Sequence, residues 1–359
     1  MLALMSVLPK LFEKVLDARL REWADRVSAL SDLQGGFRAT RGTSDQLFIL
    51  NEILSSRKES GLPSFLVFID VAKAYDRVWR PGLWHKLEAA GADRQMLDII
   101  KLMFRGVVRR VLLGVQASDE FPVGVGVPQG AVLSPLLYAL YINGLHAALR
   151  DRGLGVLVFG KLVPLLLYAD DIVLLAGSSS ELEAMLHVME EYACKWRFDV
   201  NHGKTNVMIV GSSAQRAAAS GYGFFLCGSS IAHTDEYKYL GIEFNNGSAR
   251  GKWNSLLSKM VAKSRVALSM LMFQGGGANG LRPRTMVHQW KAIVRPLLEY
   301  GCELPCGRVK SPSHGVLSWR RSNPGLDVPR SAPRLFLLRL LFARIWACPH
   351  SNRRGANIS

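Results

Sequence analysis

Apolar residues recur at helical spacing near the start of the chain and again in its last third. In the segments 7–24 and 44–58 they fall on one helix face with charged residues between them, which predicts two amphipathic helices. Ser44 is expected to act as the N-cap of the second helix. Residues 252–300 keep helical spacing and lack a strand pattern, so we expect helices there, separated near the glycines 275–277.

The middle of the chain contains short continuous apolar runs, which are typical of buried strands. Strands are expected at 65–70, 165–168, 172–175, 206–210, 222–226 and 237–244, the last two as a hairpin, with extended segments over 107–125. Helical spacing predicts helices over about 82–104, from Ser134 to about Arg150 and from Ser180 to about Trp196. This alternation predicts an α+β fold in which an antiparallel sheet carries helices on one face.

The composition is that of a folded and strongly basic protein. Of its 359 residues, 49% are hydrophobic and 21% are charged, and a chain of this length is expected to form two or three subdomains. The net charge of +16 favours a nucleic-acid partner. The segment 311–359 supplies +7 of this charge through eight arginines, no lysine and one acid, so the rest of the chain favours a polyanion more modestly.

The cysteine pattern indicates a reducing compartment. Five cysteines are scattered at positions 194, 227, 302, 306 and 348, which is not the pattern of a disulfide framework. A zinc site at Cys302 and Cys306, with His314 beyond, is not expected, because no second ligand pair follows at finger spacing. No basic leader opens the chain, and no apolar stretch is long enough to span a membrane. We therefore expect an intracellular protein of the nucleus or cytoplasm that is not secreted and has no membrane partner.

Two adjacent carboxylates, Asp170 and Asp171, stand between two apolar runs, at the expected tip of a hairpin. Like charges about 4 Å apart repel by roughly 4 kcal/mol at an effective dielectric of about 20, and a bound divalent cation such as Mg²⁺ removes that cost. An isolated acid pair in a turn is more often solvated surface. Here, however, the strand 65–70 also ends in a carboxylate, Asp70. Strands that end in carboxylates on one sheet can hold a pair of metal ions for phosphoryl or nucleotidyl transfer.

Several motifs follow one another in the order of reverse-transcriptase motifs A to E. They are Phe68-Ile69-Asp70 with Ala74-Tyr75-Asp76, Gly126-Val127-Pro128-Gln129-Gly130 with Leu133-Ser134-Pro135, Tyr168-Ala169-Asp170-Asp171, Gly203-Lys204-Thr205 and Tyr239-Leu240-Gly241. Upstream, Gln34-Gly35-Gly36-Phe37-Arg38 and Arg41-Gly42-Thr43-Ser44-Asp45-Gln46 resemble the finger motif of non-LTR (LINE-type) retrotransposon polymerases. Over about residues 6–305, the chain therefore resembles the reverse transcriptase domain of a non-LTR retrotransposon.

The resemblance implies a right-hand polymerase of the α+β class, with an antiparallel palm sheet, partial fingers and a helical thumb. On this chain it implies partial fingers at 1–63, a palm with inserted finger segments at 64–245 and a thumb at 246–305. The remaining tail, 306–359, departs from the pattern, because it is basic and rich in Pro and Ser. The tail is either a basic RNA-binding arm or, as we prefer, a non-native and disordered extension whose reading frame has drifted past its original stop.

The implied activity is RNA-directed DNA polymerisation. In this reaction, nucleotidyl transfer joins a deoxynucleoside triphosphate (dNTP) to the 3′-hydroxyl of a DNA primer on an RNA template with the help of two metal ions. Two Mg²⁺ ions, or Mn²⁺ in their place, are the implied cofactors. Asp70 and Asp170 are expected to bridge the metals and Asp171 to assist them. The backbone of Val71 is expected to approach the metal-bound triphosphate.

The resemblance also implies which residues meet the nucleotide. Tyr75 is the expected steric gate against a ribose 2′-hydroxyl, with a core tyrosine as the alternative. Asp76 is expected to be a helix-start or turn acid and not a third catalytic carboxylate. Lys204 is expected near the pyrophosphate as a cation or proton donor, or else as an exposed hairpin lysine. The other dNTP-binding candidates are Arg38 and Arg41, which can grip phosphate, and the close-approach turn Gln129-Gly130.

Nucleic acid is expected to contact both the palm and the thumb. Palm contacts are expected from Tyr168 and Gly241, and thumb contacts from basic residues that bind backbone phosphates in a salt-sensitive manner. These basic residues are Lys252, Lys259, Lys263, Arg265, Arg282, Arg284, Lys291 and Arg295. Individually each is an ordinary solvated residue, but as a set they favour a nucleic-acid partner.

The chain begins where an early finger block of related elements should end, at Leu4 to Phe12. The endonuclease and early finger segments expected of a full-length element are missing, so we expect a fragment or truncated copy. Two alternatives stay open. One is a related palm polymerase, such as a group II intron maturase or a viral RNA-dependent RNA polymerase, and Tyr75 with Tyr-Ala-Asp-Asp argues against the viral enzyme. The other is a catalytically inactive remnant that merely binds nucleic acid.

Overall fold

The computed structural model describes residues 7–300, except 115, 159, 220, 247–248, 276–279 and 281. The tail expected at 306–359 and the cysteines at 302, 306 and 348 lie outside the described residues. The chain divides into two compact units, Met1–Cys306 and Gly307–Ser359, and all described residues belong to the first. Among these residues, no helix is long and apolar enough to cross a membrane.

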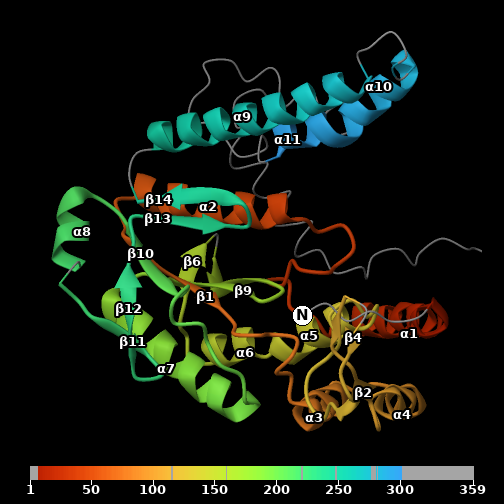
Figure 1. Ribbon diagram of the computed structural model, residues 1–359. Coiled ribbons are helices and arrows are strands. Elements are labelled where there is room, and N and C mark those ends of the chain that lie inside the picture. Colours follow the sequence, from red (N-terminus) through yellow and green to blue (C-terminus); the bar gives the residue numbers. More distant parts are fainter. Residues whose placement is uncertain are drawn as a thin grey trace, which may run out of the picture. The chain divides into compact units, whose positions relative to one another are not determined.

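A six-stranded sheet positions the predicted carboxylates. Its strands are β1 (Ser64–Asp70), β8 (Leu165–Tyr168), β9 (Asp171–Ala176), β10 (Asn206–Val210), β11 (Phe224–Leu226) and β12 (Ser229–His233). They are arranged in the order β11-β12-β10-β1-β9-β8 (Figure 1). The central strand β1 pairs antiparallel with both β9 and β10, and β8 pairs antiparallel with β9.

One strand pair contradicts the prediction of an antiparallel sheet. β10 and β12 run parallel. Parallel neighbours need a crossover connection, and here the connection after β10 passes through helix α8 (Ser213–Ala219) and strand β11. The apolar pattern did not predict α8, so it gave no sign of the crossover.

Two tight hairpins replace the single hairpin predicted from 222–226 and 237–244, so that prediction is wrong. β11 pairs with β12, and β13 (Glu236–Tyr239) pairs with β14 (Ile242–Asn245). The two central residues of each turn have positive φ, as two-residue hairpin loops require. The values are 49° and 74° for Cys227-Gly228 and 45° and 84° for Leu240-Gly241. The glycine in second place is the sequence signal for both turns.

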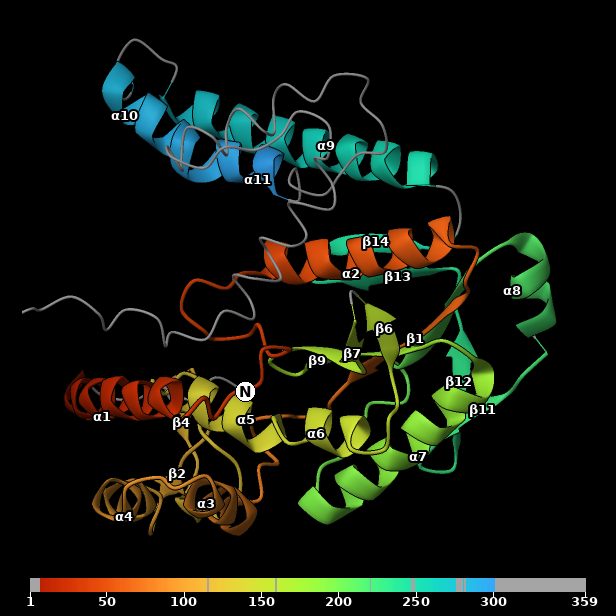
Figure 2. The same ribbon diagram turned by 180° about the vertical axis from the view of Figure 1, so that it is seen from behind.

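Helices cover the sheet from two sides, although the sequence predicted helices on one face only. Figures 1 and 2 both show α2 (Thr43–Glu59) and α7 (Ser179–Trp196) on opposite sides of β1 and β9. Both helices contact β1. Because the two central strands are covered on both faces, residues 64–69 and 172–176 are buried without alternation. Strands in such a position require the continuous apolar runs seen in the sequence.

The helices predicted near the start of the chain are present, with one correction. Helices α1 (Val7–Arg26) and α2 match their predicted segments. The N-cap of α2 is Gly42, whose N–H donates to the Asp45 carboxylate over 2.8 Å. Ser44 lies inside the helix, so its predicted role as N-cap is wrong. The Asp45 carboxylate reaches back to the capping backbone, as the third residue of a helix commonly does.

Two other regions that were predicted to be helical each form two helices. The region 82–104 forms α3 (Arg80–Ala89) and α4 (Arg94–Met103), because Gly91 turns the chain with φ of 78° and Asp93 caps α4. The helix expected from Ser134 to about Arg150 divides into α5 (Ser134–Ile142) and α6 (Leu145–Arg150). Helical spacing alone did not reveal either break.

Most of the described residues beyond 248 are helical, as predicted. They form α9 (Ala249–Gly275), α10 (Pro283–Gln289), the short π-helix η1 (Trp290–Val294) and α11 (Arg295–Glu299), and α9 packs against η1 and α11. The extended segment at 107–125 consists of two small ladders. These are β2 (Val108–Arg109) with β5 (Phe121–Pro122), and β3 (Leu112–Leu113) with β4 (Gln116–Ala117). A further ladder, β6 (Val156–Val158) with β7 (Lys161–Val163), precedes the β8–β9 hairpin.

Candidate active site

Three carboxylates meet at one end of the central sheet. Asp70 is the last residue of β1 and lies directly opposite Asp171, the first residue of β9. Asp170 lies in the two-residue turn between β8 and β9, which the pair Tyr168 and Asp171 closes. The structure therefore brings together the three acids that the sequence singled out, from strands far apart in the chain.

The three carboxylates share a partly buried and negatively charged site. Burial raises the pKa of Asp171 from 3.8 to about 6, and the charges of Asp170 and Asp70 add to the effect. Burial also raises the pKa of Asp170, with the charge of Asp70 as a further cause. The Lys204 ammonium opposes both pKa shifts. In a group of like charges such as this one, a bound divalent ion would stabilise the charged forms.

The segment that follows α7 holds the Asp70 carboxylate. The side-chain Nδ2 of Asn201 donates to Asp70 Oδ2 over 3.0 Å, and the Lys204 ammonium lies 3.5 Å from the same oxygen. The backbone N–H of Asn201 also donates to the Asp70 carbonyl over 2.8 Å. Sequence reasoning missed Asn201, although it stands just before the motif Gly203-Lys204-Thr205.

The oxygen donors of this site fit a hard cation that takes its remaining ligands from the substrate. Within the part of the chain that the structure describes, no three Asp, Glu, His or Cys side chains are grouped closely enough to hold a metal ion by themselves. Mg²⁺ is usually held by only one or two carboxylates, with water and substrate phosphates as its other ligands. Val71, the expected backbone contributor, is buried and forms an isolated β-bridge with Val200 directly after Asp70.

Tyr75 lies near the carboxylates with its ring supported from behind. The ring stacks on that of Tyr138, with centroids 5.1 Å apart and planes 20° apart. Burial, followed by the charge of Asp170, raises the pKa of both tyrosines. Tyr138 is fully buried, whereas Tyr75 is half-buried and keeps part of its surface accessible.

The loop 126–130 is anchored to the segment that carries Tyr75. The N–H of Val127 donates to the Tyr75 carbonyl over 2.7 Å. Gly126 has φ of 80°, and a Cβ there would lie 2.5 Å from the Asp76 carbonyl oxygen, so this close approach requires glycine. Asp76 therefore acts as a turn residue beneath the loop, as predicted.

The two dNTP-binding candidates of this loop, Gln129 and Gly130, follow Val127, whose N–H donates to the Tyr75 carbonyl. Gln129 is half-buried, and Gly130 is exposed with φ of 97°. Just beyond them, the buried carboxylate of Glu13 accepts a hydrogen bond from the Val132 N–H over 2.6 Å. Helix α1 therefore fixes the far end of the loop, while Tyr75 fixes the near end.

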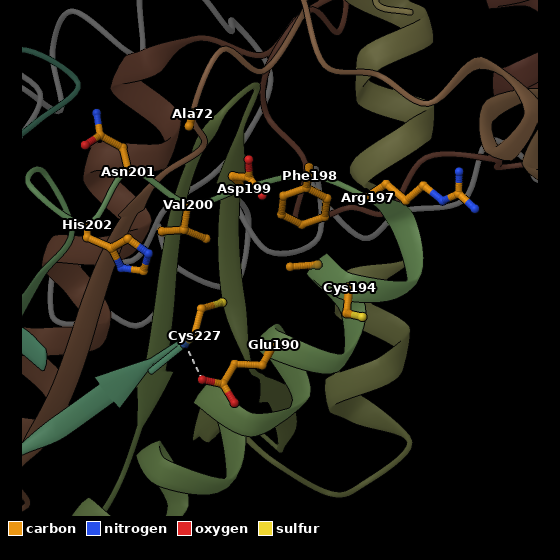
Figure 3. Close-up of a pocket in the computed structure, with 11 residues that line it drawn as sticks. Ala72, Glu190, Cys194, Arg197, Phe198, Asp199, Val200, Asn201, His202 and Cys227 are labelled. Carbon is orange, nitrogen blue, oxygen red and sulfur yellow. Dashed lines mark hydrogen bonds between the residues drawn. The ribbon is translucent and has the colours of Figure 1, made fainter. Parts of the chain in front are cut away.

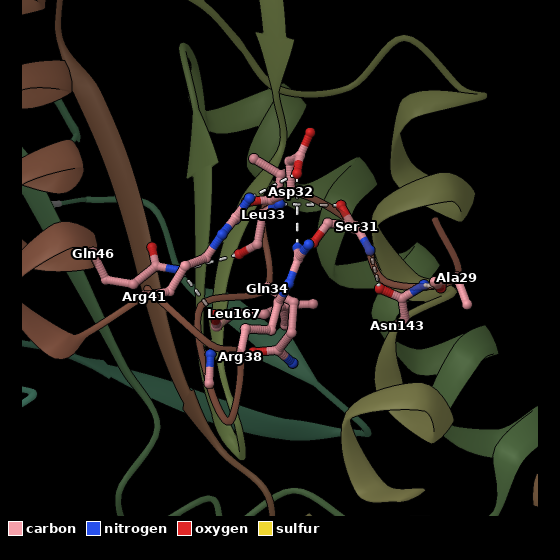
Figure 4. Close-up of polar contacts among 11 residues, drawn as sticks. Ala29, Ser31, Asp32, Leu33, Gln34, Arg38, Arg41, Gln46, Asn143 and Leu167 are labelled. Atoms are coloured by element: carbon pink, nitrogen blue, oxygen red, sulfur yellow. Dashed lines mark hydrogen bonds and ion pairs between the residues drawn. The ribbon is translucent and has the colours of Figure 1, made fainter. Parts of the chain in front are cut away.

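Arg38 and Arg41 are bound to their own loop. Figure 4 shows both guanidinium groups turned toward Asp32. Arg41 Nη2 lies 2.7 Å from Asp32 Oδ1, and Arg38 Nη1 donates to the Ser31 carbonyl over 2.9 Å. Burial, followed by the charge of Arg41, lowers the pKa of Arg38. These contacts place both arginines on the loop and not on the carboxylates, so a phosphate would have to compete with Asp32 for them.

Two of the expected nucleic-acid contacts lie at hairpin turns. Tyr168 is half-buried beside the turn that carries Asp170. Gly241 packs under the ring of Tyr300, where a Cβ would lie 3.4 Å from the nearest ring atom. The Tyr300 hydroxyl also donates to the Leu240 carbonyl. The residue that follows α11 therefore contacts the β13–β14 turn.

The expected thumb contacts are largely exposed. Lys263 lies on α9, Arg282 precedes α10 and Arg284 lies within it, and all three side chains are exposed. Lys259 is also exposed, but it forms an ion pair with Glu243 over 2.6 Å. The side chain of Lys252 lies outside the described part of the structure.

A cavity of about 780 Å³, which the sequence did not predict, lies beside Asn201 (Figure 3). It is lined by residues from the end of α7, by the segment 197–202 and by Cys227. Cys194 and Cys227 are exposed free thiols there, and burial, followed by the charge of Glu190, raises the pKa of Cys227. None of the three carboxylates lines this cavity, but Asn201, which holds Asp70, does.

Comparisons with known proteins identify the family. The protein family described as "Reverse transcriptase (RNA-dependent DNA polymerase)" matches residues 1–244 of this chain. The RNA-directed DNA polymerase from mobile element jockey of Drosophila funebris is 29% identical over 314 residues, which are 84% of this chain and 32% of the relative. The Pol polyprotein from the type-2 retrotransposable element R2DM of Drosophila melanogaster is 28% identical over 247 residues, which are 67% of this chain and 23% of the relative.

Among solved structures, telomerase from Candida tropicalis in complex with a fragment of telomeric RNA matches 95% of this chain and 51% of its own, with 13% identity and a TM-score of 0.47. The chain spans about a third of the length of the jockey polymerases that it matches. Its relatives are polymerases of mobile elements of the non-LTR type, as the order of motifs implied. Because the family match covers more than half of the chain and contains all three carboxylates, the chain belongs to the reverse transcriptase (RNA-dependent DNA polymerase) family.

Proposed function

We propose that this chain is the RNA-directed DNA polymerase domain of a non-LTR retrotransposon, with fingers, palm and thumb in a right-hand arrangement. It would add deoxynucleotides to a DNA primer along an RNA template. The observation that carries this proposal is the convergence of Asp70, Asp170 and Asp171 at one end of a sheet, on strands paired in register. The family match and the names of the relatives support the reaction class.

Asp70 and Asp170 are the residues best placed to hold two divalent ions, Mg²⁺ or Mn²⁺, with Asp171 as an auxiliary ligand and the Val71 backbone beside them. When bound, the ions would activate the primer 3′-hydroxyl and stabilise the charge on the leaving oxygen. The protein's own part is to orient the carboxylates. Asn201 holds Asp70 through its side-chain amide, and the β8–β9 turn orients Asp170.

The incoming nucleotide would lie between the carboxylates and the stacked rings of Tyr75 and Tyr138. Tyr75 is the proposed steric gate, because a ring that rests on a buried neighbour has little room to move away from a 2′-hydroxyl. Lys204 is 67% exposed and stands 3.5 Å from Asp70, where it would neutralise or protonate the departing pyrophosphate. The proposed roles of Tyr75 and Lys204 both follow from the positions of these residues beside the proposed metal site.

Template and primer would be held by the residues around this centre. Gln129 and Gly130 would support the templating base, and Arg38 and Arg41 would bind phosphate in exchange for Asp32. Tyr168 and Gly241 would contact the primer, and the exposed basic residues of the thumb would contact backbone phosphates. The basic thumb residues with described side chains are Lys259, Lys263, Arg265, Arg282, Arg284, Lys291 and Arg295. An intracellular location is part of the proposal, and the free thiols of Cys194 and Cys227 support it.

Primer extension tests the proposal. The full chain is incubated with a DNA primer annealed to an RNA template, dNTPs and Mg²⁺, and we expect the primer to lengthen to the end of the template. EDTA should stop the reaction, and ribonucleotides should replace dNTPs poorly. A catalytically inactive remnant would retain the RNA in a binding assay but leave the primer unchanged, and that result would refute the proposed activity.

A further inference from the structure

We propose that Gln34 is a positioning residue for the carboxylate turn. Its amide oxygen holds the backbone of Ala169 and thereby sets the direction of the Asp170 carboxylate. The inference rests on the proposed function, in which Asp170 binds a divalent ion. Gln34 belongs to the segment that resembles a finger motif, and nothing in the sequence places it at the carboxylates.

The side chain of Gln34 is completely buried, and its oxygen is used twice. Oε1 accepts hydrogen bonds from the Gly36 N–H over 2.9 Å and from the Ala169 N–H over 3.2 Å. Nε2 has no hydrogen-bond partner among the residues that the structure describes. Burying the Gln34 amide while its NH₂ group is unpaired costs free energy of folding. The favourable contribution of this side chain therefore comes from the two hydrogen bonds that its oxygen accepts.

The turn that Gln34 contacts needs external support. Ala169 has φ of 57°, a conformation that is unfavourable for any residue with a Cβ. It is only 5% exposed, so water does not satisfy its N–H. The strand ladder ends at the pair that closes the turn, and the Gln34 oxygen supplies the missing acceptor. Without it, a buried donor would be left unpaired one residue before Asp170.

Backbone contacts press the same segment onto the turn. The Leu167 N–H donates to the Leu33 carbonyl over 3.0 Å, and the Gly35 N–H donates to the Leu167 carbonyl over 2.8 Å. A Cβ at Gly36 would lie 2.4 Å from the Ala169 nitrogen, so the two backbones are in direct contact. A change in this segment is therefore transmitted to the turn without an intervening layer of side chains.

Gln46 offers a matched comparison within the same cluster (Figure 4). It is also buried, and its Nε2 donates to the Leu33 carbonyl over 3.2 Å and to the Leu167 carbonyl over 3.0 Å. One of these bonds ends at Leu33 and the other on β8, so neither reaches the turn itself. A substitution of Gln46 therefore disturbs the same buried cluster while the bond from Gln34 to Ala169 remains.

Variants of the full chain separate positioning from packing. Gln34→Met removes the acceptor at nearly the same length, Gln34→Glu keeps an oxygen in its place, and Gln46→Met is the packing control. Mn²⁺ binding is measured by electron paramagnetic resonance, with Asp170→Asn as the blank. Gln34→Met should weaken Mn²⁺ binding roughly five- to tenfold, the effect of one buried donor left unpaired. Gln34→Glu and Gln46→Met should stay within about twofold of the wild type, even where thermal unfolding shows a loss of stability.

In primer extension, Gln34→Met should lower kcat and leave the KM for dNTP nearly unchanged. Gly36→Ala, whose Cβ would push against the Ala169 nitrogen, is a second variant that should act in the same direction. Wild-type Mn²⁺ affinity in both variants, or an equal loss in Gln46→Met, would overturn the positioning role. A different result would refute the proposed function and leave the positioning role standing. In that case the wild type binds Mn²⁺ and Gln34→Met binds it more weakly, but the wild type extends no primer.

Discussion

Asp70 and Asp171 stand directly opposite each other as a cross-strand pair of β1 and β9, although both carry carboxylates. Like charges in this arrangement destabilise an antiparallel pair. Buried apolar residues on both strands hold the register in spite of that repulsion. Functional sites commonly contain interactions that lower the stability of the folded protein, while the surrounding residues favour the fold.

Asp171→Asn should stabilise the metal-free protein. The amide keeps the shape of the side chain but removes a charge that burial, Asp170 and Asp70 all disfavour. In EDTA, the melting temperature should rise by about 2–4 °C, the shift that roughly 1 kcal/mol produces in a domain of this size. Asp151→Asn, where the side chain is 71% exposed, is the control and should change little. A melting temperature that stays the same or falls would show that the protein already relieves the repulsion.

Asn201→Ala should slow primer extension about tenfold at saturating dNTP, because the Asp70 carboxylate loses the donor that orients it. Single-turnover extension measures the effect. Asn246→Ala is the matched control, since the Asn246 amide also donates to a carboxylate, that of Asp235, which has no role in the proposed reaction, and it should leave the rate nearly unchanged. Equal rates for both variants would mean that Asp70 is held well enough by its backbone.

Tyr75→Val should increase ribonucleotide incorporation relative to deoxynucleotide by at least about tenfold, because the smaller side chain makes room for a 2′-hydroxyl. Competition between the two substrates measures the ratio. Tyr138→Phe keeps the supporting ring and removes only a buried hydroxyl without a hydrogen-bond partner, so it should preserve discrimination. If discrimination is the same in Tyr75→Val and wild type, Tyr75 is a core residue and not a gate.

Lys86 should make stability depend on pH. Its ammonium lies over the rings of Tyr141, Tyr192 and Trp196, with 3.7 Å to the Trp196 ring centroid, and donates to the Tyr192 hydroxyl over 2.7 Å. Burial, followed by the charge of Lys195, lowers the pKa of Lys86 from 10.5 to about 6. The aromatic faces offset part of the cost of the buried charge.

Because the folded state disfavours this charge, the wild type loses stability as the pH falls from 10.5 toward 6 and regains it as the pH rises. Lys86→Met carries no charge at that position. Its advantage over the wild type in free energy of unfolding should be largest near pH 6 and shrink toward about pH 9. Urea unfolding of both proteins at the two pH values measures this difference. A difference that does not vary with pH would show that the aromatic rings fully compensate for burial.

The carboxylate site could be predicted because its signals are local. Asp70 ends one buried apolar run, and Asp170 and Asp171 interrupt another, so strand ends and a hairpin turn follow from residues close in sequence. The pairing of β1 with β9 is not local, and the sequence predicted only that strands ending in carboxylates can meet on one sheet. The prediction of turns was less successful. Two separate hairpins turn at Cys227-Gly228 and Leu240-Gly241, and the surrounding apolar runs were interpreted as the strands of a single hairpin.

Residues that act through distant contacts could not be predicted. Gln34 meets Ala169 across 135 positions of sequence, and Asn201 meets Asp70 across 131. Neither contact produces a periodicity, and both side chains lie in irregular segments. For Arg38 and Arg41 the contact is local: their basic character suggested phosphate, and the fold pairs them with Asp32 of the same loop.

The rate of primer extension by Asp70→Asn and Asp170→Asn, measured beside RNA binding, tests the central claim most directly. The amides keep the size of the side chains but remove the charge that would hold the metal ions. Each variant should extend an RNA-templated primer at least about a thousandfold more slowly than wild type, because the loss of a metal ligand removes several kcal/mol of transition-state stabilisation. The RNA affinity of each variant should stay within a few-fold of that of the wild type. More than about a tenth of the wild-type rate in either variant would contradict the assignment of these carboxylates as the catalytic metal site.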